Sequence, residues 1–157
     1  LGLPHIERDE RWQFIVIVAF LLINSLVLES NEVIATSVFV SHVGVQATCP
    51  GPRNLTDDQL RALAANGALI GIGFWDGAIC SSSPRDVAKA MRHAVSVAGL
   101  AHVALGSDWD GATTVTIAGD SAAQLTQALL DASFTEAEIR AVMGENAIRF
   151  LLANLPP

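Results

Sequence analysis

Three short apolar runs divide most of the chain at regular intervals. They are Ser37 to Ser41 (SVFVS), Ala68 to Phe74 (ALIGIGF) and His102 to Leu105 (HVAL). Each is only a few residues long and is bounded by polar or glycine-containing loops, a pattern typical of strands buried on both faces. We therefore predict three buried strands.

Amphipathic segments separate and follow these runs. Helices are predicted over 57–66 (DDQLRALAAN) and 85–99 (RDVAKAMRHAVSVAG), with Thr56 as the first N-cap and Gly67 and Gly99 as stops. Two more are predicted over 121–133 and 135–155, the last with a capping box. Strand, loop and helix in repetition predict an α/β fold with right-handed βαβ units and a parallel sheet.

The N-terminal region has a different pattern. Residues 14–28 (FIVIVAFLLINSLVL) form an almost uncharged run behind the charged segment HIERDERWQ. The run is shorter than the roughly 20 apolar residues that span a bilayer, and no clear signal-peptide cleavage site follows it. Three readings stay open: an element buried in the core, a membrane or export segment, or a surface for self-association. An exported or membrane-associated location and a cytoplasmic one are both compatible with this sequence.

Composition narrows the partners and the size of the fold. The chain has 157 residues, a formal net charge of −7 and a pI near 4.8, and it carries no basic stripe. A nucleic-acid partner held through its phosphates is therefore not expected. The length suffices for one domain but not for a complete eight-stranded α/β barrel, which needs about 250 residues.

Candidate chemistry lies where the predicted strands end. His42 follows the first run, Trp75 and Asp76 follow the second, and Asp108 and Asp110 follow the third within ALGSDWDG. Ligands of parallel α/β folds bind at the carboxyl ends of the strands, and a histidine with an aspartate is a common start for a metal-assisted hydrolase. The alternatives from the residues alone are an acidic turn and a hydrogen-bonded structural histidine.

Five motifs, in order, resemble one known family. SHVGVQATC, PRNLTDDQL, GALIGIGFW, HVALGSDWDG and MGENAIRFL are similar to the C-terminal part of the membrane (renal-type) dipeptidases, peptidase family M19, over about residues 32–155. That family is a zinc-dependent branch of the amidohydrolase superfamily, with a (β/α)8 barrel that hydrolyses dipeptides at a binuclear metal centre. The resemblance implies a partial TIM-type barrel over 32–157, with three C-terminal β/α units and C-terminal helices. Residues 1–31 are then a divergent apolar segment.

The resemblance also implies roles for individual residues. His42 matches a zinc-binding histidine, and Arg53 matches the arginine that binds the substrate's terminal carboxylate. Asp108 matches the carboxylate that transfers a proton from water to the leaving amine, whereas Asp110 shapes the loop. Cys49 and Cys80 fall where some relatives carry a disulfide, with free thiols as the alternative.

Other ligands of the family's metal centre are not recognisable in this sequence. They are a His-x-Asp near the chain start, a bridging glutamate, and a second histidine upstream of the one that His42 matches. Two hypotheses therefore stand. The chain is a zinc-dependent dipeptidase, alone or completed by another chain, or it is a non-catalytic remnant that forms homo-oligomers through apolar surface.

Overall fold

The computed structural model describes residues 38–81, 83–109, 113–115, 117–119 and 122–155. These belong to one unit, Ser37–Pro157. The expectations for 1–31, including the apolar run 14–28, and the role given to Asp110 lie outside the described residues. Within the part that is described, no helix is long and apolar enough to cross a membrane.

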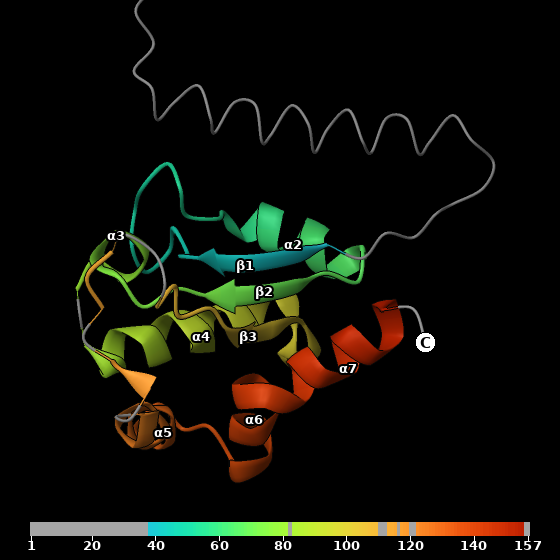
Figure 1. The fold of residues 1–157 in the computed structure, drawn as a ribbon. Coiled ribbons are helices and arrows are strands. Elements are labelled where there is room, and N and C mark those ends of the chain that lie inside the picture. Colours follow the sequence, from blue (N-terminus) through green and yellow to red (C-terminus); the bar gives the residue numbers. More distant parts are fainter. Residues whose placement is uncertain (1–37, 82, 110–112, 116, 120–121, 156–157) are drawn as a thin grey trace, which may run out of the picture. The chain divides into compact units, whose positions relative to one another are not determined.

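The sheet has three parallel strands in the order β1-β2-β3. They are β1 (Phe39–Val43), β2 (Leu69–Ile72) and β3 (Val103–Leu105). Every residue of the central strand β2 is buried, which explains its continuous apolar sequence. Figure 1 shows the three arrows pointing the same way, with α3 (Asp76–Ile79) near their carboxyl ends. The predicted α/β fold with a parallel sheet is confirmed.

Strand β1 ends later than predicted. We expected it to stop at Ser41 with His42 in the following loop, but pairing with β2 continues to Val43, opposite Ile72. The register shifts between Val40 and Val43. His42 therefore lies inside the strand, within the irregular part of the ladder, where the backbone can redirect a side chain.

Two glycines let the backbones of the sheet come unusually close. A Cβ on Gly71 of β2 would lie 2.3 Å from the carbonyl oxygen of Ser41, and one on Gly106 would lie 2.4 Å from that same oxygen. Side chains at these positions would collide with the main chain of β1, so glycine is required by space rather than by backbone angle. The first and third strands thus converge over the second.

Helices follow the predicted order with two differences. The longer ones are α2 (Asp57–Ala65), α4 (Pro84–Ala98), α5 (Ala122–Asp131), α6 (Glu136–Arg140) and α7 (Asn146–Asn154). The predicted loop after β2 contains the short helix α3, which was not foreseen. Instead of one uniform helix, 136–154 is interrupted by a π-helical turn at Ala141–Glu145. The wider turn carries Asn146 into the core, where its Nδ2 donates to the carbonyls of Leu100 and Val103, each at 2.7 Å.

Helix α4 is central to the packing against the sheet. Its fully buried residues include Val87, Met91 and Ala94, spaced to form one apolar face. On its other faces, His93 Nε2 lies 2.7 Å from Asp57 Oδ1 of α2, and Arg92 Nη1 lies 3.3 Å from Glu138 Oε1 of α6. Glu138 also closes the capping box with Thr135, as predicted from the sequence.

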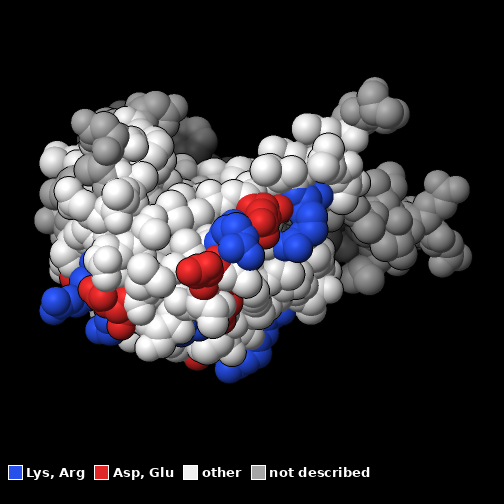
Figure 2. Space-filling view, turned by 90° about the horizontal axis from the view of Figure 1, so that it is seen from below, with Lys and Arg blue, Asp and Glu red and all other residues white. Residues whose placement is uncertain are grey.

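Charged groups on the face turned toward the viewer in Figure 2 are few and mixed in sign. Blue and red atoms lie beside one another, surrounded by uncharged residues. Ion pairs within and between helices are consistent with this mixture. One of them joins Arg140 Nε to Glu145 Oε1 at 3.6 Å. That face therefore presents no patch of a single sign.

The sheet contact at Gly71 gives a test of the fold. We expect Gly71→Ala to lower the free energy of unfolding by about 1–3 kcal/mol, because the new methyl group overlaps the Ser41 carbonyl. Gly144→Ala is the matched control, since nothing lies within 4 Å of its added Cβ. Urea unfolding followed by circular dichroism measures both variants. Equal stability of the two variants would contradict the close approach.

The start of α4 gives a pH-dependent test. Hydrogen bonds from the Ser81 and Ser83 hydroxyls, at 2.6 and 2.7 Å, hold the pKa of Asp86 below its ordinary value. A carboxyl with a lowered folded-state pKa contributes stability that is present above its unfolded pKa of roughly 3.9 and is lost as pH falls through the folded value. We expect Asp86→Asn to lower stability at pH 7 and to flatten its decrease below pH 4, measured by urea midpoints. An unchanged acid slope would show that these hydrogen bonds do not favour the ionised form.

Candidate functional site

His42 and Asp108 lie together although their strands are not neighbours. His42 Nε2 is 3.9 Å from Asp108 Oδ1. In a flat sheet the first and third strands would be roughly 9.6 Å apart, so the convergence over Gly71 matters for this pairing. The Ser41 hydroxyl forms a 2.8 Å hydrogen bond with His42 Nδ1, which leaves Nε2 as the nitrogen that faces the carboxylate.

Asp108 has an uncommon backbone. Its φ is 58°, in the left-handed region that few residues other than glycine adopt. The side chain is 14% exposed, and Oδ2 accepts a hydrogen bond from the Thr113 hydroxyl at 3.3 Å. Such backbone conformations persist where the surroundings hold them, and they gather at functional sites. The loop thus turns this carboxylate toward β1.

Trp75 links the histidine to the arginine. Its indole is 6% exposed, and its ring meets that of His42 edge to face with centroids 5.4 Å apart. The guanidinium carbon of the exposed Arg53 lies 5.4 Å from the Trp75 ring centroid. Trp75, a candidate from the sequence because it follows the second predicted strand, is thus in contact with both His42 and Arg53.

Asp76 and Trp109 also lie close to the ends of predicted strands. Asp76 is exposed, and its Oδ1 accepts a hydrogen bond from the Gly77 amide at 2.8 Å, within its own helix. Trp109 packs edge to face on Phe74, and its indole donates to the Ile117 carbonyl at 2.7 Å. These contacts are structural, so neither residue joins the pair at 42 and 108.

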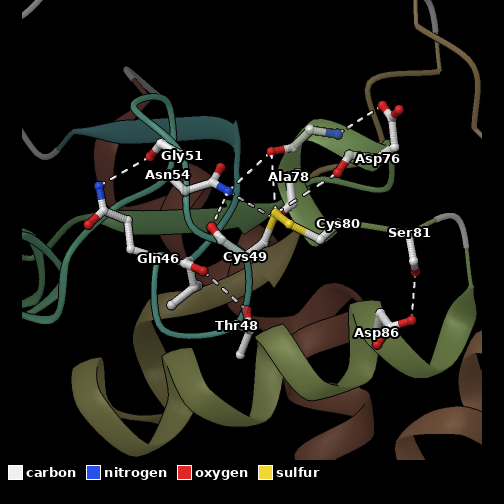
Figure 3. Close-up of a disulfide and its surroundings, with 12 residues drawn as sticks. Gln46, Thr48, Cys49, Gly51, Asn54, Asp76, Ala78, Cys80, Ser81 and Asp86 are labelled. Carbon is white, nitrogen blue, oxygen red and sulfur yellow. Dashed lines mark hydrogen bonds between the residues drawn. A yellow bond between two sulfur atoms is a disulfide. The ribbon is translucent and has the colours of Figure 1, made fainter.

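A disulfide joins the loop that carries Arg53 to the end of α3. Cys49 and Cys80 are bonded, at a sequence separation of 31. Asn54, which the sequence reading passed over, is buried beside this bond. Figure 3 shows its amide turned toward Cys49 and Ala78. In the sequence, Asn54 is distinguished only by its place directly after Arg53. An asparagine next to an arginine is too common to indicate a role in a site.

The described residues bring together one imidazole and one carboxylate. No group of three or more histidine, cysteine, aspartate or glutamate side chains is placed to hold a metal ion within the described part of the chain. Zinc sites in proteins use three or four protein ligands. The described residues alone therefore do not complete a zinc site.

Comparisons with known proteins agree on one family. The membrane dipeptidase family, peptidase family M19, matches residues 25–154 by its sequence profile. A curated relative, the uncharacterized protein in the pqqA 5′ region of Klebsiella pneumoniae, is 33% identical over 127 residues, covering 74% of this chain and 47% of the relative.

Solved structures are similar in fold and sequence. A metallo peptidase from Rhodobacter sphaeroides, bound to a phosphinate mimic of the dipeptide L-Ala-D-Ala, is 26% identical with a TM-score of 0.69, over 76% of this chain and 37% of that one. Dipeptidase AC, a metallo peptidase of family M19, is 28% identical with a TM-score of 0.65, over 74% and 36%.

This chain thus spans about half the length of the curated relative, at 47%, and little more than a third of the two solved chains, at 37% and 36%. The family profile nevertheless covers most of the sequence, and the motifs that carry His42, Arg53 and Asp108 fall inside the matched range 25–154. The chain belongs to the membrane dipeptidase family, peptidase family M19.

Proposed function

We propose that this chain is the carboxyl-terminal part of a zinc-dependent dipeptidase with a (β/α)8 barrel, and that it acts on the peptide bond of dipeptides. Support comes above all from the 3.9 Å approach of His42 to Asp108 at the carboxyl edge of the sheet. Trp75 contacts both Arg53 and His42, and His42 in turn faces Asp108, so a residue suited to bind a carboxylate lies near the pair that includes the proposed proton-transfer group.

Asp108 is proposed to transfer the proton. Hydrolysis adds water across the peptide bond, so a base must take a proton from the water and an acid must give one to the departing amine. A single carboxylate that is mostly shielded from solvent can do both in turn. The hydrogen bond from Thr113 to Oδ2 holds the group and leaves Oδ1 directed at His42.

Arg53 is proposed to bind the substrate's terminal carboxylate. A guanidinium offers parallel N–H donors that match two carboxylate oxygens, which a lysine cannot reproduce. The indole of Trp75 beneath it gives a firm apolar surface and a cation–π contact. The site would thereby select substrates that carry a free acid at the correct distance from the scissile bond.

Zinc is proposed as the metal because the family is metal dependent, with His42 as one ligand. The remaining ligands would come from residues outside the described part of this chain or from another chain, since the described residues do not provide three. The proposal therefore assigns no reaction step to the metal. Membrane contact through residues 14–28 is likewise a proposal, based on their apolar sequence.

One observation favours a second candidate, a non-catalytic protein that associates with itself. Four apolar side chains at the end of the chain are exposed, Ile148 at 59%, Leu151 at 46%, Leu152 at 79% and Leu155 at 62%, and Phe39 of β1 is 49% exposed. The ring centroids of Phe39 and Phe150 of α7 lie 5.9 Å apart. This contact connects β1 to the helix that bears most of the exposed apolar side chains. Burial of this surface between two copies would stabilise a homo-oligomer without any chemistry.

The enzyme proposal is tested by Asp108→Asn. If Asp108 transfers the proton, kcat for a simple dipeptide such as alanyl-alanine should fall by about 10²- to 10⁴-fold while KM changes little. Asp58→Asn is the control, because Asp58 is 96% exposed and pairs only with Arg61 in the described structure. Zinc content and hydrolysis are measured on the same samples.

Two outcomes would count against these assignments. Less than one zinc per chain together with no hydrolysis by the unmodified protein would favour the self-associating alternative, which light scattering then checks. Hydrolysis that survives Asp108→Asn undiminished would remove the proton-transfer role and leave the family assignment untouched.

The role of Arg53 is tested by Arg53→Lys. We expect the Kd for alanyl-alanine to rise about tenfold, since the bidentate contact is lost, while the Kd for its C-terminal amide stays the same. NMR titration measures both constants without requiring turnover. Arg61→Lys is the matched control on an exposed arginine. A parallel change in acid and amide binding would contradict carboxylate recognition by Arg53.

A further inference from the structure

Asn54 is a buried polar residue whose amide has a dense set of partners. Its side chain is 3% exposed, and Nδ2 lies 2.8 Å from the Cys49 carbonyl, 3.1 Å from that of Gly77 and 3.3 Å from that of Ala78. An amide nitrogen has two hydrogens, so the three acceptors share them. Figure 3 shows this amide between the loop of Cys49 and the turn of Ala78.

The acceptors belong to two different segments. Cys49 lies in the loop that also carries Arg53, whereas Gly77 and Ala78 lie in α3, which begins directly after Trp75. The side chain of Asn54 therefore fastens the loop of Arg53 to α3, the helix that begins directly after Trp75, whose indole lies beneath the arginine. The disulfide joins the same two segments, but its attachment is at Cys49, four positions before Arg53 in the sequence.

The opposite side of the same amide rests on the end of β1. A Cβ on Gly44 would lie 2.3 Å from Asn54 Oδ1 and 2.1 Å from the Ala78 carbonyl oxygen. Oδ1 has no hydrogen-bond partner in the described structure. A rotated amide would turn its oxygen toward three carbonyl oxygens, which is unfavourable, so the donors fix the orientation although the oxygen is left unpaired.

Gly44 is two residues after His42, and its carbonyl accepts a hydrogen bond from the Leu55 amide at 2.9 Å. Asn54 thus sits where three parts of the site meet: the strand of His42, the loop of Arg53 and the helix after Trp75. A long exposed arginine side chain has considerable rotational freedom, so its average position depends on how firmly its own backbone is held.

We propose that Asn54 is a positioning residue, which holds the Arg53 guanidinium over Trp75 and thereby sets the preference for a free C-terminal carboxylate. This inference rests on the proposed function, in which Arg53 binds that carboxylate. Asn54 touches neither the substrate nor the reacting atoms in this role. It acts through the backbone of the residue next to it.

The test replaces Asn54 by aspartate, which has the same shape but carries an oxygen acceptor where asparagine has the Nδ2 donor. In Asn54→Asp the carboxylate faces the three carbonyl oxygens, so we expect the loop to leave α3. The ratio of Kd values for the C-terminal amide and the free acid of alanyl-alanine should fall about tenfold, measured by NMR titration. Upfield shifts of the Arg53 side-chain protons, caused by the Trp75 ring, should decrease at the same time.

Three further variants make the experiment specific. Asn66→Asp is the matched control, because Asn66 is exposed and its Nδ2 makes one hydrogen bond, to the Ala62 carbonyl at 2.8 Å. Asn54→Ser retains one donor without adding charge, so we expect it to give an intermediate ratio of the two Kd values. This variant replaces Asn54→Asp in the test if Asn54→Asp does not fold. Paired Cys49→Ser and Cys80→Ser should lower stability but leave the ratio largely unchanged, because Asn54 still holds Arg53.

The outcomes distinguish the positioning role of Asn54 from carboxylate recognition by Arg53. An unchanged ratio and unchanged Arg53 shifts in a folded Asn54→Asp or Asn54→Ser variant would overturn the positioning role. Equal binding of acid and amide by the unmodified protein would overturn carboxylate recognition by Arg53, and with it the proposed selectivity. In that case the Arg53 proton shifts still decide whether Asn54 orders the guanidinium.

Discussion

The close approach of the Ser41 carbonyl to Gly71 and Gly106 is the constraint on which the candidate site depends. Parallel strands separated by one intervening strand are about 9.6 Å apart in a flat sheet, and side chains that stand perpendicular to the sheet would stay about that far apart. Glycine at position 71 of β2 and at position 106, directly after β3, lets β1 and β3 bend together, to the point where added Cβ atoms would lie within 2.4 Å of one carbonyl oxygen. The register shift in β1 and the left-handed backbone of Asp108 then complete the approach.

The sequence contained enough to predict the order of elements, because that order depends on local patterns. Apolar runs of strand length, Thr56 and Thr135 as N-caps and the glycines after helices all act within a few residues, and the strands and principal helices appear near the predicted positions. Local signals were weaker at boundaries. β1 extends past Ser41 because pairing with β2 continues to Val43, whereas the polar residues at 41 and 42 interrupt the apolar run from which the end of the strand was predicted.

The geometry of the site was less accessible from sequence. Motif order pointed to His42, Arg53 and Asp108, but the position of Trp75 between two of them depends on how α3 begins, and α3 itself was read as a loop. Asn54 and Asn146 were missed for a common reason. Each is a buried amide that donates to carbonyls distant in sequence, so its importance exists only once the tertiary structure has brought those carbonyls together.

The described residues of this chain hold the surroundings of Arg53 more completely than those of His42. On the side of Arg53, a disulfide, a buried amide and an indole hold the loop from within residues 44–80, so the proposed carboxylate-binding group is positioned by residues that the structure describes. On the side of His42, the described residues add only one carboxylate, which is too few for a zinc ion. In the proposed function, recognition of the substrate's terminal carboxylate therefore rests on residues that the structure describes, whereas cleavage of the peptide bond also needs metal ligands from outside them.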